Sequence, residues 1–329
     1  MAGADPVLDS NDFLREAAPA VWAALSPLGR LSRQPANFLP LQTAEARGKP
    51  FNATIGQITD GYGHAVPLPS MAAALPELSD EERSRAFLYS SVEGLPNLRR
   101  AWRDWQRRGQ RDELPSSLPL VTIGTAQARC LAADLFVSEG RTVVLPDPCR
   151  EADHDLFSMK LGARVLTCDC MQGGHFDPSA ITHLLADLPE GEPALVLLEF
   201  PREKTAYMPV NRERLSLCSS LTAAAEHRPL LAIVDDTWEG LGTPGNSLFW
   251  SLTGLHANLI PLKVDGAEGH LGFPGGRVGF LTLPCNPDSG IAAAMESKVK
   301  MLLRAQVGSP SAASQVMLLR LLRERLSGI

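Results

Sequence analysis

No stretch of the sequence is apolar enough to cross a membrane, because none reaches the roughly 18 uncharged residues that such a helix needs. The first residues also lack the basic cluster of a secretory signal, since Asp5 and Asp9 occupy that region. We therefore expect a cytoplasmic protein without a membrane partner.

Basic residues are not in excess either. The 329-residue chain has 31 Lys and Arg against 37 Asp and Glu, which gives a formal net charge of −6. Binding to a phosphate backbone needs clustered cationic side chains. We therefore expect no nucleic-acid partner.

Cysteine is sparse, and its six copies lack the dense, regular spacing of a domain held together by disulfides. Cys168 and Cys170, with His175 nearby, suggest a metal site. Structural zinc sites, however, normally use Cys-x2-Cys or wider spacing. We expect free thiols and no metal.

What the chain does contain, from about residue 118 onwards, is short runs rich in Leu, Val and Ile that alternate with longer amphipathic stretches. This alternation is typical of a three-layer α/β fold with a doubly wound, mainly parallel sheet. Helical spacing over 126–139, 177–188 and 212–227 would supply the crossovers. The expected strands are Leu120–Ile123, Thr142–Leu145, Arg164–Cys168, Ala194–Phe200, Leu230–Asp235, Leu259–Val264 and Val278–Leu283.

The two ends of the chain differ from this middle part. Residues 1–50 are rich in Pro and Ala with one helical patch, Asp12 to Leu25, so we expect an N-terminal arm followed by one large domain over 51–329. Near the other end, Gln315 to Leu326 has apolar residues on one face and arginines largely on the other. This pattern predicts a helix packed on the domain.

Five segments, in order, resemble the aspartate and aromatic aminotransferases, which are class I/II pyridoxal-phosphate enzymes of fold type I. Their order and spacing are more specific than any one motif. The resemblance implies the aminotransferase large domain, and the small C-terminal domain of the family is expected to be missing. The segments are residues 51–56, 89–99, 122–136, 200–209 and 263–280.

The resemblance assigns cofactor contacts to several residues. Asp235 stands where the family has the aspartate that keeps the pyridine nitrogen protonated, which makes the ring an electron sink. Arg277 matches the arginine that grips the cofactor phosphate. Gly124, Thr125 and Ala126 would present backbone N–H groups at a helix start to the same phosphate. Trp238 replaces the tyrosine near the ring oxygen.

The Schiff-base lysine of the family is absent, which implies a degenerate active site. Relatives have Asp-Gly-Ala-Thr-Lys where this chain has Asp-Gly-Ala-Glu-Gly over 265–269, so Gly269 takes the lysine position. No other natural side chain both forms the aldimine and shuttles the Cα proton. Arg150 stands in place of the ring-stacking aromatic, and residues 203–206 replace Asn-Pro-Thr-Gly. We expect no covalent cofactor, and pyridoxal phosphate could bind only non-covalently.

The leading hypothesis is a repurposed enzyme of specialised metabolism that binds a small acidic or phosphorylated molecule and performs acid–base chemistry other than transamination. Its candidate catalytic residues are His270, Glu203, Lys204 and Glu268, with His270 suited to proton transfer near neutral pH. His270 could equally be a solvated residue, because 270–276 is expected to be a loop. A non-catalytic homologue serving as a partner or scaffold subunit is one alternative. An aminotransferase using Lys263 or Lys204 as a substitute nucleophile is another. We expect a homodimer.

Overall fold

The computed structural model describes residues 6–32, 39–49, 54, 59–60, 62, 64–74, 76–110, 114–203, 205–241 and 246–327. The chain divides into two compact units, Met1–Val66 and Pro67–Ile329. The expected arm over 1–50 lies in the first unit. Apart from Thr54, the motif at 51–56 lies outside the described residues.

The first unit is built from short helices with little core. The helix expected from Asp12 to Leu25 is two helices, because Pro19 has no backbone N–H to continue the first one. Arg15 and Arg30 lie over the Trp22 ring, 4.6 and 5.0 Å from its centroid. The helices are α1 (Pro6–Ala17), α2 (Pro19–Ala24), α3 (Pro27–Leu31) and α4 (Leu39–Glu45).

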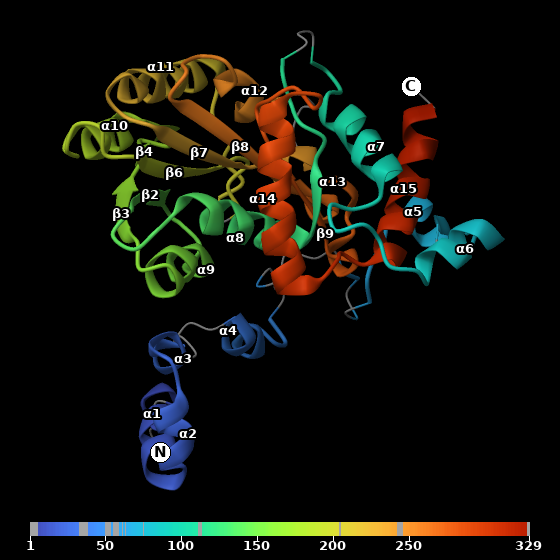
Figure 1. Cartoon of the computed structure of the whole chain (residues 1–329), viewed down its shortest axis with the longest axis horizontal. Coiled ribbons are helices and arrows are strands. Elements are labelled where there is room, and N and C mark those ends of the chain that lie inside the picture. Colours follow the sequence, from blue (N-terminus) through green and yellow to red (C-terminus); the bar gives the residue numbers. More distant parts are fainter. Residues whose placement is uncertain are drawn as a thin grey trace. The chain divides into compact units, whose positions relative to one another are not determined.

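The second unit contains a seven-stranded sheet in the order β1-β9-β8-β7-β6-β2-β3 (Figure 1). All seven predicted strands are confirmed, and the sheet is parallel except for β9, which runs antiparallel to both neighbours. A small hairpin, β4 (Met171–Gln172) with β5 (His175–Phe176), follows β3. The sheet strands are β1 (Leu120–Ile123), β2 (Thr142–Asp147), β3 (Arg164–Asp169), β6 (Ala194–Glu199), β7 (Leu230–Asp235), β8 (Leu259–Gly266) and β9 (Val278–Thr282).

Both faces of the sheet are covered by helices, which makes three layers (Figure 1). In β7, Leu230, Ala232 and Val234 belong to one core cluster, while Leu231 and Ile233 belong to the other, as the two-residue period of a strand requires. The first cluster includes α10 (Ser179–Ala186), α11 (Asn211–His227) and α12 (Leu248–Leu252). The second includes α8 (Gly124–Phe136), the π-helical turn Asp155–Lys160 and α14 (Gly290–Val307), with α9 (Glu151–His154) before that turn.

A third core cluster lies at the β1–β9 edge, where α15 packs against α5, α6 and α7. The predicted C-terminal helix is thus confirmed as a packed element, with Leu318, Leu321 and Leu322 buried. No helix among the described residues is both long and apolar enough to cross a membrane. The helices here are α5 (Pro69–Ala74), α6 (Asp80–Ala86), α7 (Pro96–Gln106), α13 (Ala267–Leu271) and α15 (Ala312–Ser327).

Candidate functional site

The carboxyl ends of β2 and β7 carry a closed ring of ion pairs, here called the charge ring, formed by Arg129, Asp153, Arg150 and Asp235. Asp235 Oδ2 is 2.6 Å from Arg129 Nη1 and 2.6 Å from Arg150 Nη2. Asp153 is 3.0 Å from Arg129 Nε and 2.7 Å from Arg150 Nε. Each carboxylate therefore contacts both guanidinium groups, and the two positive charges are matched by two negative ones. Arg129, Asp153 and Asp235 are buried, whereas the Arg150 side chain is 15% exposed.

Asp235 has no acceptor capacity left. Its Oδ1 accepts hydrogen bonds from the backbone N–H and the hydroxyl of Thr237, at 3.0 and 2.6 Å. Its Oδ2 accepts from the two arginines. An ionised carboxylate has about four lone-pair sites, so all are taken. Burial raises the pKa of Asp235, but Arg150 and Arg129 more than compensate and hold it well below its ordinary value.

Glu199, at the end of β6, is an extra carboxylate beside the charge ring. Its Oε1 lies 3.1 Å from Arg150 Nη1, whereas the half-exposed Glu203 is 3.6 Å from the same nitrogen. Burial raises the pKa of Glu199 to about 7 although Arg150 opposes the change. The hollow bordered by Arg150, Asp153 and Glu199 has a volume of only ≈ 20 Å³, which is room for about one water molecule.

The raised pKa of Glu199 predicts a pH-dependent contribution to stability. The folded state keeps this proton to a higher pH than the unfolded chain, so the contribution is complete below the ordinary value of 4.5 and is lost as pH rises through about 7. Glutamine does not titrate, so the free energy of unfolding of Glu199→Gln should rise relative to that of wild type by on the order of 2–3 kcal/mol as pH increases from 4.5 to about 7. Urea unfolding at a series of pH values measures this difference, and parallel curves for the two proteins would contradict it.

Glu268, in α13, lies beside the start of α8 and bonds two of the residues predicted to contact the phosphate. Its Oε2 accepts from the Thr125 hydroxyl at 2.8 Å, and its Oε1 accepts from Arg277 Nη1 at 2.8 Å. Gly124 permits this approach, because it has a positive φ of 71° and any Cβ there would lie 2.7 Å from Glu268 Oε1. Ala126 is exposed in the first turn of the same helix.

The backbone of Thr237 leaves no room for a side chain at position 269. Gly269 lies in α13, and its Cα faces the turn after β7. A Cβ at this position would lie 2.9 Å from the carbonyl carbon of Thr237, closer still to its oxygen, and 2.9 Å from Trp238 Cε3. A side chain of any kind therefore requires the backbone around Thr237 to move. The indole N–H of Trp238 is buried and has no hydrogen-bond partner among the residues that the structure describes.

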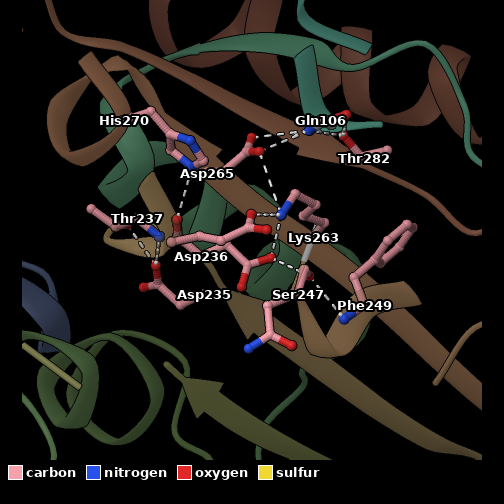
Figure 2. Close-up of polar contacts among 12 residues, drawn as sticks. Gln106, Asp235, Asp236, Thr237, Ser247, Phe249, Lys263, Asp265, His270 and Thr282 are labelled. Atoms are coloured by element: carbon pink, nitrogen blue, oxygen red, sulfur yellow. Dashed lines mark hydrogen bonds and ion pairs between the residues drawn. The ribbon is translucent and has the colours of Figure 1, made fainter. Parts of the chain in front are cut away.

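Lys263 lies in the middle of β8 and is fully buried among three carboxylates (Figure 2). Its ammonium group bonds Asp236, lies 2.8 Å from Glu239 Oε2 and is 3.6 Å from Asp265 Oδ2. Burial alone would lower the pKa of Lys263, but these carboxylates raise it well above its ordinary value. Trp102 and Gln106 of α7 donate to Asp265, at 3.0 and 2.9 Å.

His270 joins the same region from α13, so the loop expected over 270–276 is wrong at its first residues, because the segment continues β8 as a helical turn to Leu271. Its Nε2 donates to the backbone oxygen of Asp236 at 3.1 Å, and its Nδ1 accepts from Trp105 Nε1 at 3.4 Å. Both ring nitrogens are therefore used. Burial lowers the pKa of His270, which favours the neutral ring.

The structure thus places the predicted residues in three groups. Asp235 and Glu203 lie around Arg150, Glu268 lies with Thr125 and Arg277, and His270 lies with the Lys263 cluster. Lys204 lies outside the described residues. Sequence reasoning missed Arg129, Asp153 and the cluster partners of Lys263. The sequence pattern that could have identified these residues is a charged residue on an otherwise apolar helix face or within an apolar strand.

A separate hollow of the second unit has a volume of ≈ 770 Å³ and lies between residues 88–92 and 304–312. None of the predicted site residues that the structure describes lines it. Among the described residues, no group of three or more His, Cys, Asp or Glu is arranged to hold a metal. Cys168 and Cys170 have their sulfurs 3.6 Å apart.

Comparison with known proteins gives a consistent picture. The model of a family described as aminotransferase class I and II matches residues 49–327. An aminotransferase from Anaerococcus prevotii DSM 20548 is similar in structure, with a TM-score of 0.75 and 19% identity over 88% of this chain and 73% of that chain. The broad specificity aminotransferase from Leishmania mexicana has a TM-score of 0.70 and 17% identity over 94% and 77%.

A third similar structure is the aromatic-amino-acid aminotransferase from Burkholderia pseudomallei, described as covalently bound to pyridoxal phosphate. Its TM-score is 0.67, with 19% identity over 88% of this chain and 73% of that chain. At such identities the likeness shows the fold alone. No curated protein matches the chain.

Proposed function

We propose that this chain, which belongs to the class I and II aminotransferases by the family model that matches residues 49–327, is a non-catalytic member of that family and serves as a partner or scaffold subunit. In this proposal it neither holds pyridoxal phosphate nor transaminates. The observation that carries the proposal is the packing at Gly269. The Thr237 backbone fills the space that a lysine side chain would need to leave this position, so the loss is more than a missing amine.

The ring end of the cofactor does not fit the residues present. A pyridinium N–H needs an acceptor, and the four acceptor sites of Asp235 are occupied by Thr237, Arg129 and Arg150. Arg150 also brings a fixed positive charge against Asp235, where a second cation would be repelled. The ≈ 20 Å³ hollow beside it leaves no space for an aromatic ring.

The substitute-lysine alternative is disfavoured by the state of Lys263. Nucleophilic attack needs a neutral amine, whereas the neighbouring carboxylates raise the pKa of this ammonium group and keep it protonated. The side chain is also fully buried. Lys204 lies outside the described residues, and the experiment below covers it.

The repurposed-enzyme alternative needs acid–base groups that converge on one substrate space. His270 has both nitrogens bonded within the protein, and Glu268 has both carboxylate oxygens bonded to Thr125 and Arg277. The two residues belong to separate contact groups, and neither borders the hollow beside Arg150. These contacts favour the non-catalytic role.

An absorption spectrum with added pyridoxal phosphate tests the proposal. We expect wild type to show no absorption band of an aldimine at about 400–430 nm. After borohydride reduction, no lysine should carry pyridoxal phosphate. Gly269→Lys should also lack the band, because its side chain has no path past Thr237, and should unfold more easily than wild type by about 1–3 kcal/mol. Gly275→Lys is the matched control, since a Cβ there meets nothing within 4 Å. A reducible band in wild type or in Gly269→Lys would refute this part of the proposal.

A subunit role needs a surface for another chain. Phe87 and Tyr89 are each 91% exposed, and Leu88 between them borders the ≈ 770 Å³ hollow. An exposed apolar patch next to a groove is typical of a protein interface, and we propose a second copy of this chain as its occupant. Light scattering of the purified protein should give the mass of a dimer. A monomer at all concentrations, alone or mixed with an active family member, would contradict the subunit role.

A further inference from the structure

We propose that Glu268 is a built-in anion that fills an anion-binding cup at the start of α8, and that this cup takes inorganic phosphate once the carboxylate is removed. The cup is formed by the side chains of Thr125 and Arg277 beside the start of α8. It does not depend on the subunit role or on the missing lysine, because it concerns a different set of contacts.

The contacts of Glu268 are those of a bound anion. One oxygen accepts from a hydroxyl and the other from a guanidinium, both at 2.8 Å, and the side chain is only 8% exposed. The helix beside it has 13 residues, and the N-terminal end of such a helix carries a partial positive charge that attracts an anion. A buried carboxylate is stable only where such partners are gathered.

The backbone is shaped to bring these groups together. Arg277 has a positive φ of 49°, which is uncommon for a residue with a side chain, and Gly124 has a φ of 71°. The N–H of Gly124 donates to the backbone oxygen of Arg277 at 3.0 Å, which ties the start of α8 to the residue before β9. An uncommon conformation held by its surroundings is often found at binding sites.

The cup can be reached from solvent. The Arg277 side chain is 49% exposed although its partner Glu268 is buried. A dissolved anion therefore meets the guanidinium first but is repelled by the carboxylate already bound to it. To enter, the anion must displace a charge that would then lose its buried partners. Glu268 consequently excludes the phosphate group of a cofactor. This exclusion is independent of the charge ring, which lies where the family holds the pyridine ring.

The test is thermal unfolding against inorganic phosphate, with sodium chloride at matched ionic strength. Wild type should show no specific rise in Tm. Glu268→Ala should show a rise of roughly 5 °C when phosphate reaches about fifty times its dissociation constant. Glu268→Gln, which keeps the shape of the side chain without its charge, should show a smaller rise. Calorimetric titration of the folded variants with phosphate gives the same ranking without heating.

Two variants separate a specific site from a general salt effect. Glu268→Ala combined with Arg277→Ala should lose the response to phosphate, because the guanidinium is removed. Glu226→Ala changes an exposed carboxylate of α11, on the other face of the sheet, and should behave as wild type. A wild-type response as large as that of Glu268→Ala, or no response in either Glu268 variant, would overturn the inference. Either of these results can be obtained whether or not an aldimine band appears, so this test is independent of the test of the proposed function.

Discussion

Replacing Lys263 by methionine should lower the free energy of unfolding by about 3–5 kcal/mol at neutral pH, the usual cost of breaking a buried ion pair from one side. Methionine keeps most of the volume of the side chain, so the loss comes from charge. Without the ammonium group, the buried carboxylates of Asp236, Glu239 and Asp265 repel one another. Urea unfolding with a two-state fit measures the change.

The same variant has a pH signature. Burial raises the pKa of Asp236 to about 7 even though the ammonium group opposes the change. As pH falls through this value Asp236 takes up a proton and no longer needs the ammonium group, so the difference in unfolding free energy between wild type and Lys263→Met should narrow. Adding Asp236→Asn to Lys263→Met should recover part of the stability, because it removes one of the unpaired charges. Lys298→Met, at an exposed position of α14, is the control. A cost below about 1 kcal/mol, with no dependence on pH, would contradict the buried cluster.

Replacing Arg150 by methionine should cost a similar amount, about 3–5 kcal/mol, because it opens the charge ring. Arg150 contacts Asp235, Asp153 and Glu199, and its removal leaves Arg129 as the remaining arginine of the ring. The pKa of Arg150 is raised well above its ordinary value, since these carboxylates outweigh the effect of burial. The measurement is the unfolding free energy at neutral pH.

A double-mutant cycle distinguishes the ring from simple packing. Arg150→Met combined with Asp153→Asn should cost less than the sum of the two single changes, because each removes a charge that the other leaves unpaired. Arg212→Met, at an exposed position of α11, is the matched control and should change stability by less than about 0.5 kcal/mol. Additive single and double variants would show that Arg150 and Asp153 act independently, against the geometry described above.

The fold could be predicted well from the sequence because its signals are local. The seven apolar runs between Leu120 and Leu283 became the seven strands of the sheet. The helix expected from Asp12 to Leu25 was wrong in one respect, since Pro19 breaks it. The periodicity of apolar residues had concealed this break, which a strict reading of proline would have found.

The site was harder to predict because its contacts join residues far apart in the sequence. Arg150 was identified as an altered ring-stacking position, but its bond to Asp235 links residues 85 positions apart. The sequence makes Glu268 a catalytic candidate, but its bond to Thr125 spans 143 positions. Spacing rules hold within one helix or strand. They cannot show which of several charged side chains at neighbouring strand ends pair with one another.

The closed ring of Arg129, Asp153, Arg150 and Asp235 also limits how this protein can change. Exchanging Arg150 for an aromatic side chain would leave the neighbouring carboxylates short of a cation before any ligand could replace it. Exchanging Asp235 would strand two guanidinium groups in the same way. A change at Arg150 or at Asp235 alone therefore gives a less stable chain, and a second substitution within the ring must accompany it to avoid that loss.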